Sequence, residues 1–364
     1  MDRRFFLGSA AATLALPGCA TTMGARRTEA TPTGCLPRVL VSPDRVIRTV
    51  AGLRPYRASG FVVRAEALGD KRLVHNYGHG GAGITLSWGS SKLATLLGLQ
   101  GHQGPVAVLG AGVMGLSTAR LVQEAGFPVT LYAKALPPDT TSNIAGGQFH
   151  PFGHFRRDRV TPEWQAQFVA AVDYSWRRFQ IMVGDDYGIR WLPTYTDAPE
   201  PEAQLIPTFP PHNRLLRADE HPFPWASATS FDTLYVETGR YLRQLMRDIQ
   251  LAGGTIRIRD FATPADIAAL PERLIFNCTG LGSRALFNDE ELRPARGQLA
   301  ILLPQPEINY AFTGGDGYMF PRPDGIILGG TFELDEWDTT PEPSAIARIL
   351  ASHQQLNAGL RCTT

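Results

Sequence analysis

A glycine-rich turn between two apolar runs constrains the fold of this 364-residue chain more than any other feature. A strand-like run leads into Gly110-x-Gly112-x-x-Gly115, a helical pattern follows, and a second strand-like run begins at Pro128. In a βαβ unit, the first glycine of this spacing makes the tight turn, the second lets the backbone approach a pyrophosphate, and the third lets helix and strand pack closely. The N-terminus of the helix also attracts phosphate charge. The spacing therefore predicts a dinucleotide-binding unit, the alternative being glycines that serve only a turn.

The composition is that of a chain with a large apolar core and balanced charge. Hydrophobic residues make up 43% of the chain, and its length suggests two domains. The formal net charge is +1, and no basic stripe with interleaved aromatic residues occurs, which argues against nucleic acid as a partner. No apolar run in the sequence has the length that a membrane-spanning helix needs.

The first residues have the pattern of a targeting segment rather than of a folded element. Arg3 and Arg4 precede a short apolar stretch that ends just before Cys19 and is too short to span a membrane. This pattern resembles a twin-arginine export signal joined to a bacterial lipoprotein cleavage box. We therefore predict an exported, periplasmic protein with a lipid anchor at Cys19, the alternative being an N-terminus that carries no signal. Residues 1–37 form the export signal and linker, and residues 38–364 form the body.

A second glycine-rich segment lies upstream of the first, in residues 75–85. Four glycines fall within six residues of this segment, just before a helical pattern begins. Without side chains, the backbone N–H groups of such a loop form a concave surface that can hold an anionic group. We predict that this segment is a second cofactor-cradling loop.

Paired histidines raise the question of a metal site. His75 and His79 are four residues apart, as are His150 and His154. Glycines in the first interval and Pro151 in the second prevent a shared helical face, and no set of cysteine or carboxylate ligands accompanies them. We therefore predict no metal.

The residue that follows the second strand of the βαβ unit is unusual. A dinucleotide fold carries an acidic residue for the ribose about twenty residues after the glycine turn. This chain has Lys134 there. A cation at this place disfavours NAD and leaves NADP or FAD open, because it suits a 2′-phosphate.

Arg54 stands before a proline, between two strand-like runs, in the turn-like segment 52–57. A planar guanidinium can bind a carboxylate through two parallel hydrogen bonds, which a lysine cannot reproduce. A surface or structural ion pair is the alternative, and the spacing alone favours that alternative.

Together these pieces resemble the D-amino-acid oxidase family of flavoproteins. The most specific stretch is HNYGHGG followed by GxG and Trp-Gly, in residues 75–89. The resemblance covers most of residues 45–360 and implies an α/β fold with a Rossmann-like FAD-binding domain and a mixed-sheet α+β substrate domain. The matching stretches are GAGVMGLSTA (110–119), YAKALPPDTTSNIAGGQ (132–148), LYVETGRYL (234–242), NCTG (277–280), RGQ (296–298), GYMFPRPDGIILGGTFEL (317–334), GLRPYR (52–57) and HNYGHGGAGITLSWG (75–89).

The order of these stretches differs from that of the family. Residues 52–57 and 75–89 correspond to the end of the family's chain, yet here they precede the nucleotide-binding turn. The sequence therefore resembles a circular permutant, in which the short connector 101–104 joins the family's last helix to its first strand. The implied FAD-binding segments are mainly 75–155 and 252–290, and the implied substrate-binding segments are mainly 38–74, 156–251 and 291–364.

The resemblance implies roles for particular residues. Arg54 corresponds to the arginine that binds the substrate carboxylate, which reverses the preference for an ion pair. Tyr318 corresponds to a tyrosine near the substrate, and Tyr235 is the candidate for a second carboxylate contact. Lys134 replaces the family's acid at the ribose. The residues that would contact FAD are Gly80, Gly81, Gly83, Thr85, Gly110, Gly112, Gly115, Thr141, Gly147 and Gly280.

The implied reaction is the oxidative deamination of a D-amino acid. Hydride transfer from Cα–H to flavin N5 gives an imino acid, which water converts to a 2-oxo acid and ammonia. O2, which would yield hydrogen peroxide, or another electron acceptor then takes the electrons, and the protein supplies position and electrostatics. Three alternatives stay open: a dehydrogenase that passes electrons to a membrane quinone, an enzyme for glycine or sarcosine-like secondary amines, and a catalytically silent flavin-binding protein.

The permuted order also bears on the cysteines. Cys35 and Cys362 flank two ends that should lie close together, and an exported protein meets an oxidising compartment. We therefore propose a disulfide between them, the alternative being two free thiols on separate tails. Cys278, inside a buried strand pattern, is expected in the core.

Overall fold

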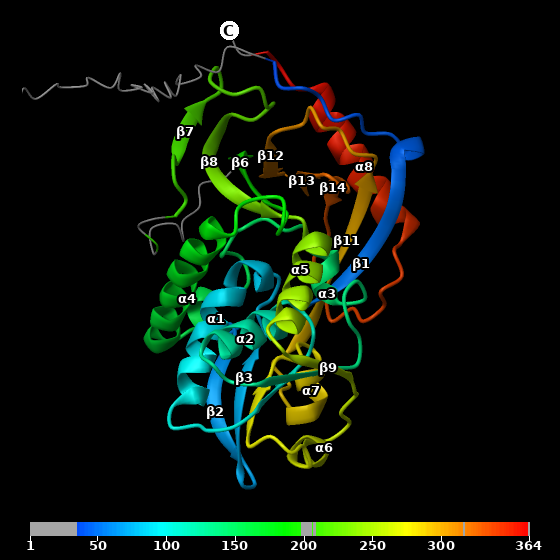
Figure 1. The fold of residues 1–364 in the computed structure, drawn as a ribbon. Helices are drawn as coiled ribbons and strands as arrows, with labels where there is room; N and C mark the ends of the chain where they lie inside the picture. Colours follow the sequence, from blue (N-terminus) through cyan, green and yellow to red (C-terminus); the bar gives the residue numbers. More distant parts are fainter. Residues whose placement is uncertain (1–34, 198–205, 207–208, 316, 363–364) are drawn as a thin grey trace, which may run out of the picture.

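The computed structural model describes residues 35–362, except 198–205, 207–208 and 316. The predicted export signal, including Arg3 and Cys19, lies outside the described residues. Two mixed β-sheets with helices packed on them make up the body; in the view of Figure 1 the nine-stranded sheet lies above the six-stranded one. This two-sheet α/β architecture confirms the predicted fold class.

The six-stranded sheet is built around the predicted βαβ unit. Its strand β4 (Val106–Leu109) is buried along its whole length, because strands flank it on both sides and helices cover it. It pairs in parallel with β5 (Val129–Ala133), to which α2 (Val113–Glu124) connects it, and also in parallel with β10 (Leu274–Asn277). The order is β2-β3-β10-β4-β5-β9. The remaining strands are β2 (Val62–Leu68), β3 (Lys71–Tyr77) and β9 (Thr255–Ile258).

The glycine turn after β4 has the conformation that its sequence predicts. Gly110 has a φ of +103°, and a Cβ there would lie 2.5 Å from the carbonyl oxygen of Cys278. A Cβ on Gly115 would overlap the carbonyl oxygen of Gly110, so glycine is needed for α2 to pack closely on the turn. The packing of the chain itself therefore requires both glycines.

The nine-stranded sheet begins with two long antiparallel strands. β1 (Val46–Tyr56) pairs with β11 (Arg293–Leu302), and this register places Gly52 opposite Gly297. The order is β1-β11-β14-β13-β12-β6-β8-β7, with β15 beside β11, and α8 (Pro343–Ala358) packs on β11, β13 and β14. The other strands are β6 (Ile189–Thr196), β7 (Arg214–Arg217), β8 (Ser227–Val236), β12 (Ala311–Gly314), β13 (Gly317–Arg322), β14 (Gly325–Gly329) and β15 (Glu333–Leu334).

Helices pack together over the six-stranded sheet. α1 (Gly83–Leu99) contacts both α2 and α4 (Pro162–Ile181), and its buried Trp88 donates a hydrogen bond of 2.7 Å to the hydroxyl of Tyr241 in α5 (Thr238–Leu251). Within the described part of the chain, no helix is both long and apolar enough to cross a membrane. The short helices are α3 (Thr141–Ile144), α6 (Pro264–Ala268) and α7 (Gly282–Phe287), with the 3-10 turns η1 (Pro43–Arg45) and η2 (Arg157–Arg159).

The chain passes between the two sheets before it reaches the glycine turn. β1 lies in the nine-stranded sheet, whereas the next strands, β2 and β3, lie in the six-stranded sheet. β2 and β3, which fall mostly in the predicted substrate-binding segment 38–74, therefore lie in the sheet that carries the glycine turn. After α1 ends at Leu99, residues 100–105 lead directly into β4.

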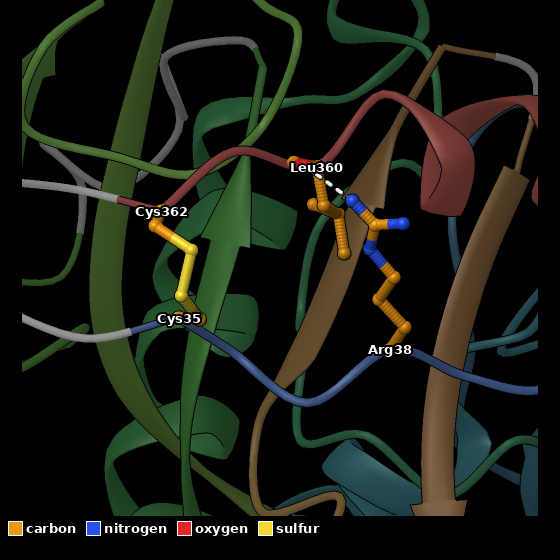
Figure 2. The surroundings of a disulfide bond; sticks show 4 residues. All are labelled: Cys35, Arg38, Leu360 and Cys362. Atoms are coloured by element: carbon orange, nitrogen blue, oxygen red, sulfur yellow. Dashed lines mark hydrogen bonds between the residues drawn. A yellow bond between two sulfur atoms is a disulfide. The ribbon is translucent and has the colours of Figure 1, made fainter.

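The ends of the described chain are joined by the proposed disulfide, which is thereby confirmed (Figure 2). Cys35 and Cys362 are bonded, with their Cα atoms 4.3 Å apart. Beside the bond, Nη2 of Arg38 donates a hydrogen bond of 2.9 Å to the carbonyl oxygen of Leu360. Cys278 is buried, as predicted.

Candidate active site

A cavity of about 1790 Å³ is lined by residues from both sheets. On one side it is bounded by the segments that follow the carboxyl ends of β4, β5 and β10, where ligands of parallel sheets bind, and by the loop between β3 and α1. On the other side it is bounded by β1, β11 and β13. The predicted site residues that line it are Arg54, Tyr318, Gly80, Gly81, Gly83, Gly110, Gly112, Thr141, Gly147 and Gly280.

The loop between β3 and α1 reaches the cavity because it lacks side chains. Gly78, Gly80 and Gly81 have φ values of +86°, +57° and +111°. A Cβ on Gly80 would lie 2.7 Å from the carbonyl oxygen of His154, and a Cβ on Gly81 would lie 3.0 Å from Cδ of Arg54. The loop leads into the N-terminus of α1, which favours negative charge.

The turn between β4 and α2 forms the second glycine cradle. The Val113 amide donates a hydrogen bond of 3.0 Å to Oγ of Ser142 in α3, so α3 closes over the start of α2. A Cβ on Gly112 would lie 3.2 Å from the same oxygen. Both cradles are therefore spaces that a side chain would fill, and they suit the backbone-bound phosphates of a dinucleotide.

Gly115 and Thr85 do not line the cavity formed by the described residues, and their assignment as cofactor contacts stays a prediction. Gly115 lies behind the turn, against Gly110. Oγ1 of Thr85 accepts a hydrogen bond of 2.9 Å from the His150 amide and donates one of 3.2 Å to the His150 carbonyl. Since His150 itself lines the cavity, these two hydrogen bonds of Thr85 hold this part of the cavity wall in place.

Arg54 reaches the cavity without an ion-pair partner among the described residues. Its Nη1 donates a hydrogen bond of 3.0 Å to the carbonyl oxygen of Thr331, which leaves other guanidinium N–H donors for a ligand. Arg57, by contrast, forms ion pairs with Asp289 at 3.2 Å and Glu291 at 2.8 Å. The structural ion pair that the spacing favoured is therefore formed by Arg57, not by Arg54.

The two predicted tyrosines have different environments. Tyr318 lines the cavity and stacks on Phe320, with 4.5 Å between ring centroids. Tyr235 is 2% exposed, its ring centroid lies 5.2 Å from that of Phe320, and its hydroxyl shares a hydrogen bond of 3.0 Å with the Thr194 hydroxyl. Burial raises the pKa of Tyr235, so its phenol stays neutral. Tyr235 does not line the cavity formed by the described residues, and its role as a carboxylate contact stays a prediction.

Two buried histidines stand beside the cradle. Nε2 of His79 shares a hydrogen bond of 2.9 Å with Oγ of Ser90, and its ring stacks on Phe61. Burial lowers the pKa of His79 and of His154 to about 3, so both rings are neutral at ordinary pH. In the ranges that the structure describes, no group of three or more His, Cys, Asp or Glu side chains could hold a metal ion.

Sequence reasoning missed three residues on the substrate side of the cavity. Phe332 and Trp337, about half exposed, line it, and the Phe332 ring centroid lies 5.9 Å from Cζ of Arg54. Gly297 of β11 lines it as well. Gly297 and Phe332 lie within the RGQ and GGTFEL stretches, so the signal was present, but the spacing did not show which residues face the cavity.

The adenosine end of the predicted site carries neighbouring cations. Lys134, exposed after β5, and Arg259, after β9, both line the cavity, and the Arg259 amide donates a hydrogen bond of 2.9 Å to the Ala133 carbonyl. Asp260 also lines this end, so an acid is present that the sequence spacing did not indicate. The fold and cavity together define a dinucleotide-binding protein in which a second sheet closes over the cofactor cleft.

Comparison with known proteins identifies the family. The model of the FAD dependent oxidoreductase family matches residues 28–97 and 105–361, and the chain belongs to this family. It is 31% identical over 272 residues to the D-amino-acid oxidase of Streptomyces coelicolor, covering 68% of this chain and 76% of that protein. It is 29% identical over 267 residues to the D-amino acid oxidase of Dugesia ryukyuensis, covering 70% and 78%. A human D-aspartate oxidase is 27% identical over 257 residues, covering 68% and 74%.

Solved structures share the fold. Glycine oxidase from Geobacillus kaustophilus superposes with a TM-score of 0.55 at 14% identity, covering 72% of this chain and 81% of that chain. Iminodiacetate oxidase from Chelativorans sp. BNC1 superposes with a TM-score of 0.54 at 16% identity, covering 70% and 79%. The protein is thus an FAD-dependent oxidoreductase of the amino acid oxidase and dehydrogenase type, and FAD is its cofactor. The residues that would hold FAD are Thr141 and four glycines whose backbones no side chain covers: Gly80, Gly81, Gly110 and Gly112.

Proposed function

We propose that the protein oxidises D-amino acids with neutral side chains to 2-oxo acids and ammonia, with O2 as the electron acceptor and hydrogen peroxide as the second product. FAD, when bound, supplies the acceptor for the two electrons and the hydrogen that leave Cα of the substrate. The protein contributes the binding, orientation and desolvation of the amino acid.

The observation that carries this proposal is the environment of Arg54. Its side chain lines the cavity: the aliphatic part lies next to Gly81 of the cradle loop, and the guanidinium lies next to Gly297 of β11. A carboxylate bound to Arg54 would therefore lie where the cofactor cradle and the nine-stranded sheet meet. The planar guanidinium can offer such a carboxylate two parallel N–H donors.

The charge of the cavity supports a neutral substrate side chain. Among the described lining residues contributed by β1, β11, β13 and the segment after β14, Arg54 is the one charged side chain. Once Arg54 holds the α-carboxylate, this wall has no second cation for an acidic side chain. Its other members include Tyr318, Phe320, Phe332 and Trp337, which suit apolar groups.

A substrate panel tests the proposal. Hydrogen peroxide should form with D-alanine and D-proline, and much more slowly with D-aspartate, glycine and sarcosine. Arg54→Ala should slow turnover by at least about 100-fold, whereas Arg48→Ala, which replaces an exposed arginine on the same strand, should not. Activity with an artificial acceptor but without peroxide would instead identify a dehydrogenase. Turnover that Arg54→Ala leaves unchanged would contradict the role of Arg54.

We also propose that the chain is a circular permutant of its family. The family model matches in two parts, separated between α1 and β4, and Cys35 and Cys362 hold the two ends together. A rearranged gene would begin at Gly104, link residue 362 to residue 35 through a short peptide, and end at Gln100. With both cysteines replaced by serine, it should still yield a soluble, FAD-containing protein, and failure of this protein to fold would contradict the proposal.

Export remains a proposal that rests on the sequence. We propose that Arg3 and Arg4 direct the folded protein to the periplasm and that Cys19 carries a lipid. Replacing both arginines by lysine should retain the protein in the cytoplasmic fraction, and Cys19→Ala should release it from membranes. An unchanged distribution of either variant would refute the corresponding signal.

A further inference from the structure

Gly297 lies where β11 passes directly beside Arg54. The register of β1 and β11 pairs Gly297 with Gly52, two residues before Arg54. A Cβ built on Gly297 would lie 2.5 Å from both Cζ and Nη1 of Arg54, and closer still to Nη2. The guanidinium therefore lies across the bare Cα of Gly297. A side chain at this position would have to displace either the guanidinium or the strand.

The strand that carries Gly297 is fixed on both sides of the glycine. Arg296 is 4% exposed and forms ion pairs with Glu333 and Glu342. Gln298 is fully buried, its Nε2 donates a hydrogen bond of 2.9 Å to Glu333, and its Oε1 accepts one of 2.7 Å from the Glu342 amide. A shift of this strand would break the hydrogen bonds and ion pairs of the buried Arg296 and Gln298 side chains, which costs more than moving the end of one arginine.

The guanidinium is confined by further contacts. Nη1 of Arg54 donates to the Thr331 carbonyl at 3.0 Å, while Oγ1 of Thr331 accepts a hydrogen bond of 3.1 Å from the Gln298 amide. The same residue thus fixes both the strand and the guanidinium. On the other side, a Cβ on Gly81 would lie 3.0 Å from Cδ of Arg54, so the aliphatic part of Arg54 also has little room.

We infer that Gly297 is a positioning residue for Arg54: the lack of a side chain at this position sets where the guanidinium presents its donors to a substrate carboxylate. The part of this inference that concerns the carboxylate rests on the proposed function. The steric part concerns only the protein, because Gly297 acts through Arg54 rather than on the substrate.

Kinetics of Gly297→Ala test the inference. The added methyl group should raise KM for D-alanine at least about tenfold, with a smaller change in kcat, because it displaces the group that binds the carboxylate. The flavin content and visible spectrum should not change. Gly239→Ala in α5 is the matched control, since a Cβ there meets nothing closer than 3.5 Å, and its KM should equal that of the wild type. An unchanged KM in Gly297→Ala would overturn the inference.

Measuring the effect of Gly297→Ala on Tm in the Arg54→Ala variant as well as in the wild type separates an effect on Arg54 from a general structural effect. In Arg54→Ala, adding Gly297→Ala should lower Tm less than it does in the wild type, because the atoms that the methyl group meets are gone. If Gly297→Ala alone does not fold, the double variant should restore soluble, flavin-containing protein. These readouts need no substrate, so they stand even if the proposed function fails. Equal losses of stability in both backgrounds would overturn the inference by placing the strain in the strand.

Discussion

Replacing Cys35 and Cys362 together by serine should lower the thermal stability of the protein without emptying the flavin site. The disulfide links residues separated by 327 positions in sequence, so it removes a very large loop from the unfolded ensemble. The chain-entropy relation gives about 6 kcal/mol at 25 °C for such a loop, and measured disulfides contribute up to about 5 kcal/mol. An unfolding entropy of about 0.7 kcal/mol/K for a body of about 330 residues converts about 3 to 5 kcal/mol into a Tm decrease of roughly 4 to 7 °C.

The native contacts near the disulfide explain why the fold should survive. The Val39 amide donates a hydrogen bond of 3.0 Å to Oδ1 of Asn357, and the Tyr310 hydroxyl donates one of 2.8 Å to the Pro37 carbonyl. These contacts hold the first described segment against α8 and against the segment before β12 without the covalent bond. The loss should therefore appear in the unfolding transition rather than in the flavin spectrum.

The assay is thermal unfolding followed by tryptophan and flavin fluorescence, with and without dithiothreitol. Reductant should lower Tm of the wild type to that of the double serine variant and should not change the variant itself. Cys278 does not interfere, because burial raises the pKa of its thiol to about 12 and keeps it protonated. Equal Tm values for the wild type, the reduced protein and the variant would refute the reasoning.

Three further predictions concern the cradle and its support. Gly110→Ala should lose most bound FAD, because position 110 has a positive φ and the added Cβ would clash with the Cys278 carbonyl oxygen. Gly126→Ala, at a φ of +88° with no neighbour within 4 Å, should keep its FAD, and equal flavin content in the two variants would contradict this prediction. Thr85→Val should cost about 1 to 3 kcal/mol of stability in denaturant unfolding, because it removes both hydrogen bonds to His150; no change would show that they contribute nothing. The pKa of His79 is lowered to about 3, below its unfolded value, so the unfolded state binds more protons at acidic pH. The free energy of unfolding should therefore fall as pH drops from about 6.5 towards 3, by up to about 1.4 kcal/mol per pH unit. His79→Gln should flatten this slope, and an unchanged slope would refute the prediction.

Local sequence patterns correctly predicted the glycine turn and the strand and helix that flank it. The turn from Gly110 to Gly115 and its flanking strand and helix follow from hydrophobic periodicity and from glycine spacing, and the structure confirms them. The disulfide between Cys35 and Cys362 followed from the expected closeness of the two ends, which is a topological argument.

Features set by long-range packing could not be predicted in this way. Tyr235 lies in β8, whose partner β6 is about 40 residues earlier in the sequence, so its spacing did not show that it contacts Thr194. Arg57, three residues after Arg54, pairs with Asp289 and Glu291, whereas Arg54 has no ion-pair partner among the described residues. Such pairings depend on which distant segments the fold brings together, and local sequence patterns do not show this.

Reduction of the bound flavin under anaerobic conditions tests the central claim most directly, because it needs no electron acceptor. We predict that D-alanine bleaches the flavin of the wild type and of Arg48→Ala, that L-alanine does not, and that Arg54→Ala is slower by at least about 100-fold, as the loss of charged hydrogen bonds implies. Equal rates of bleaching by D-alanine in the wild type and in Arg54→Ala would contradict the account.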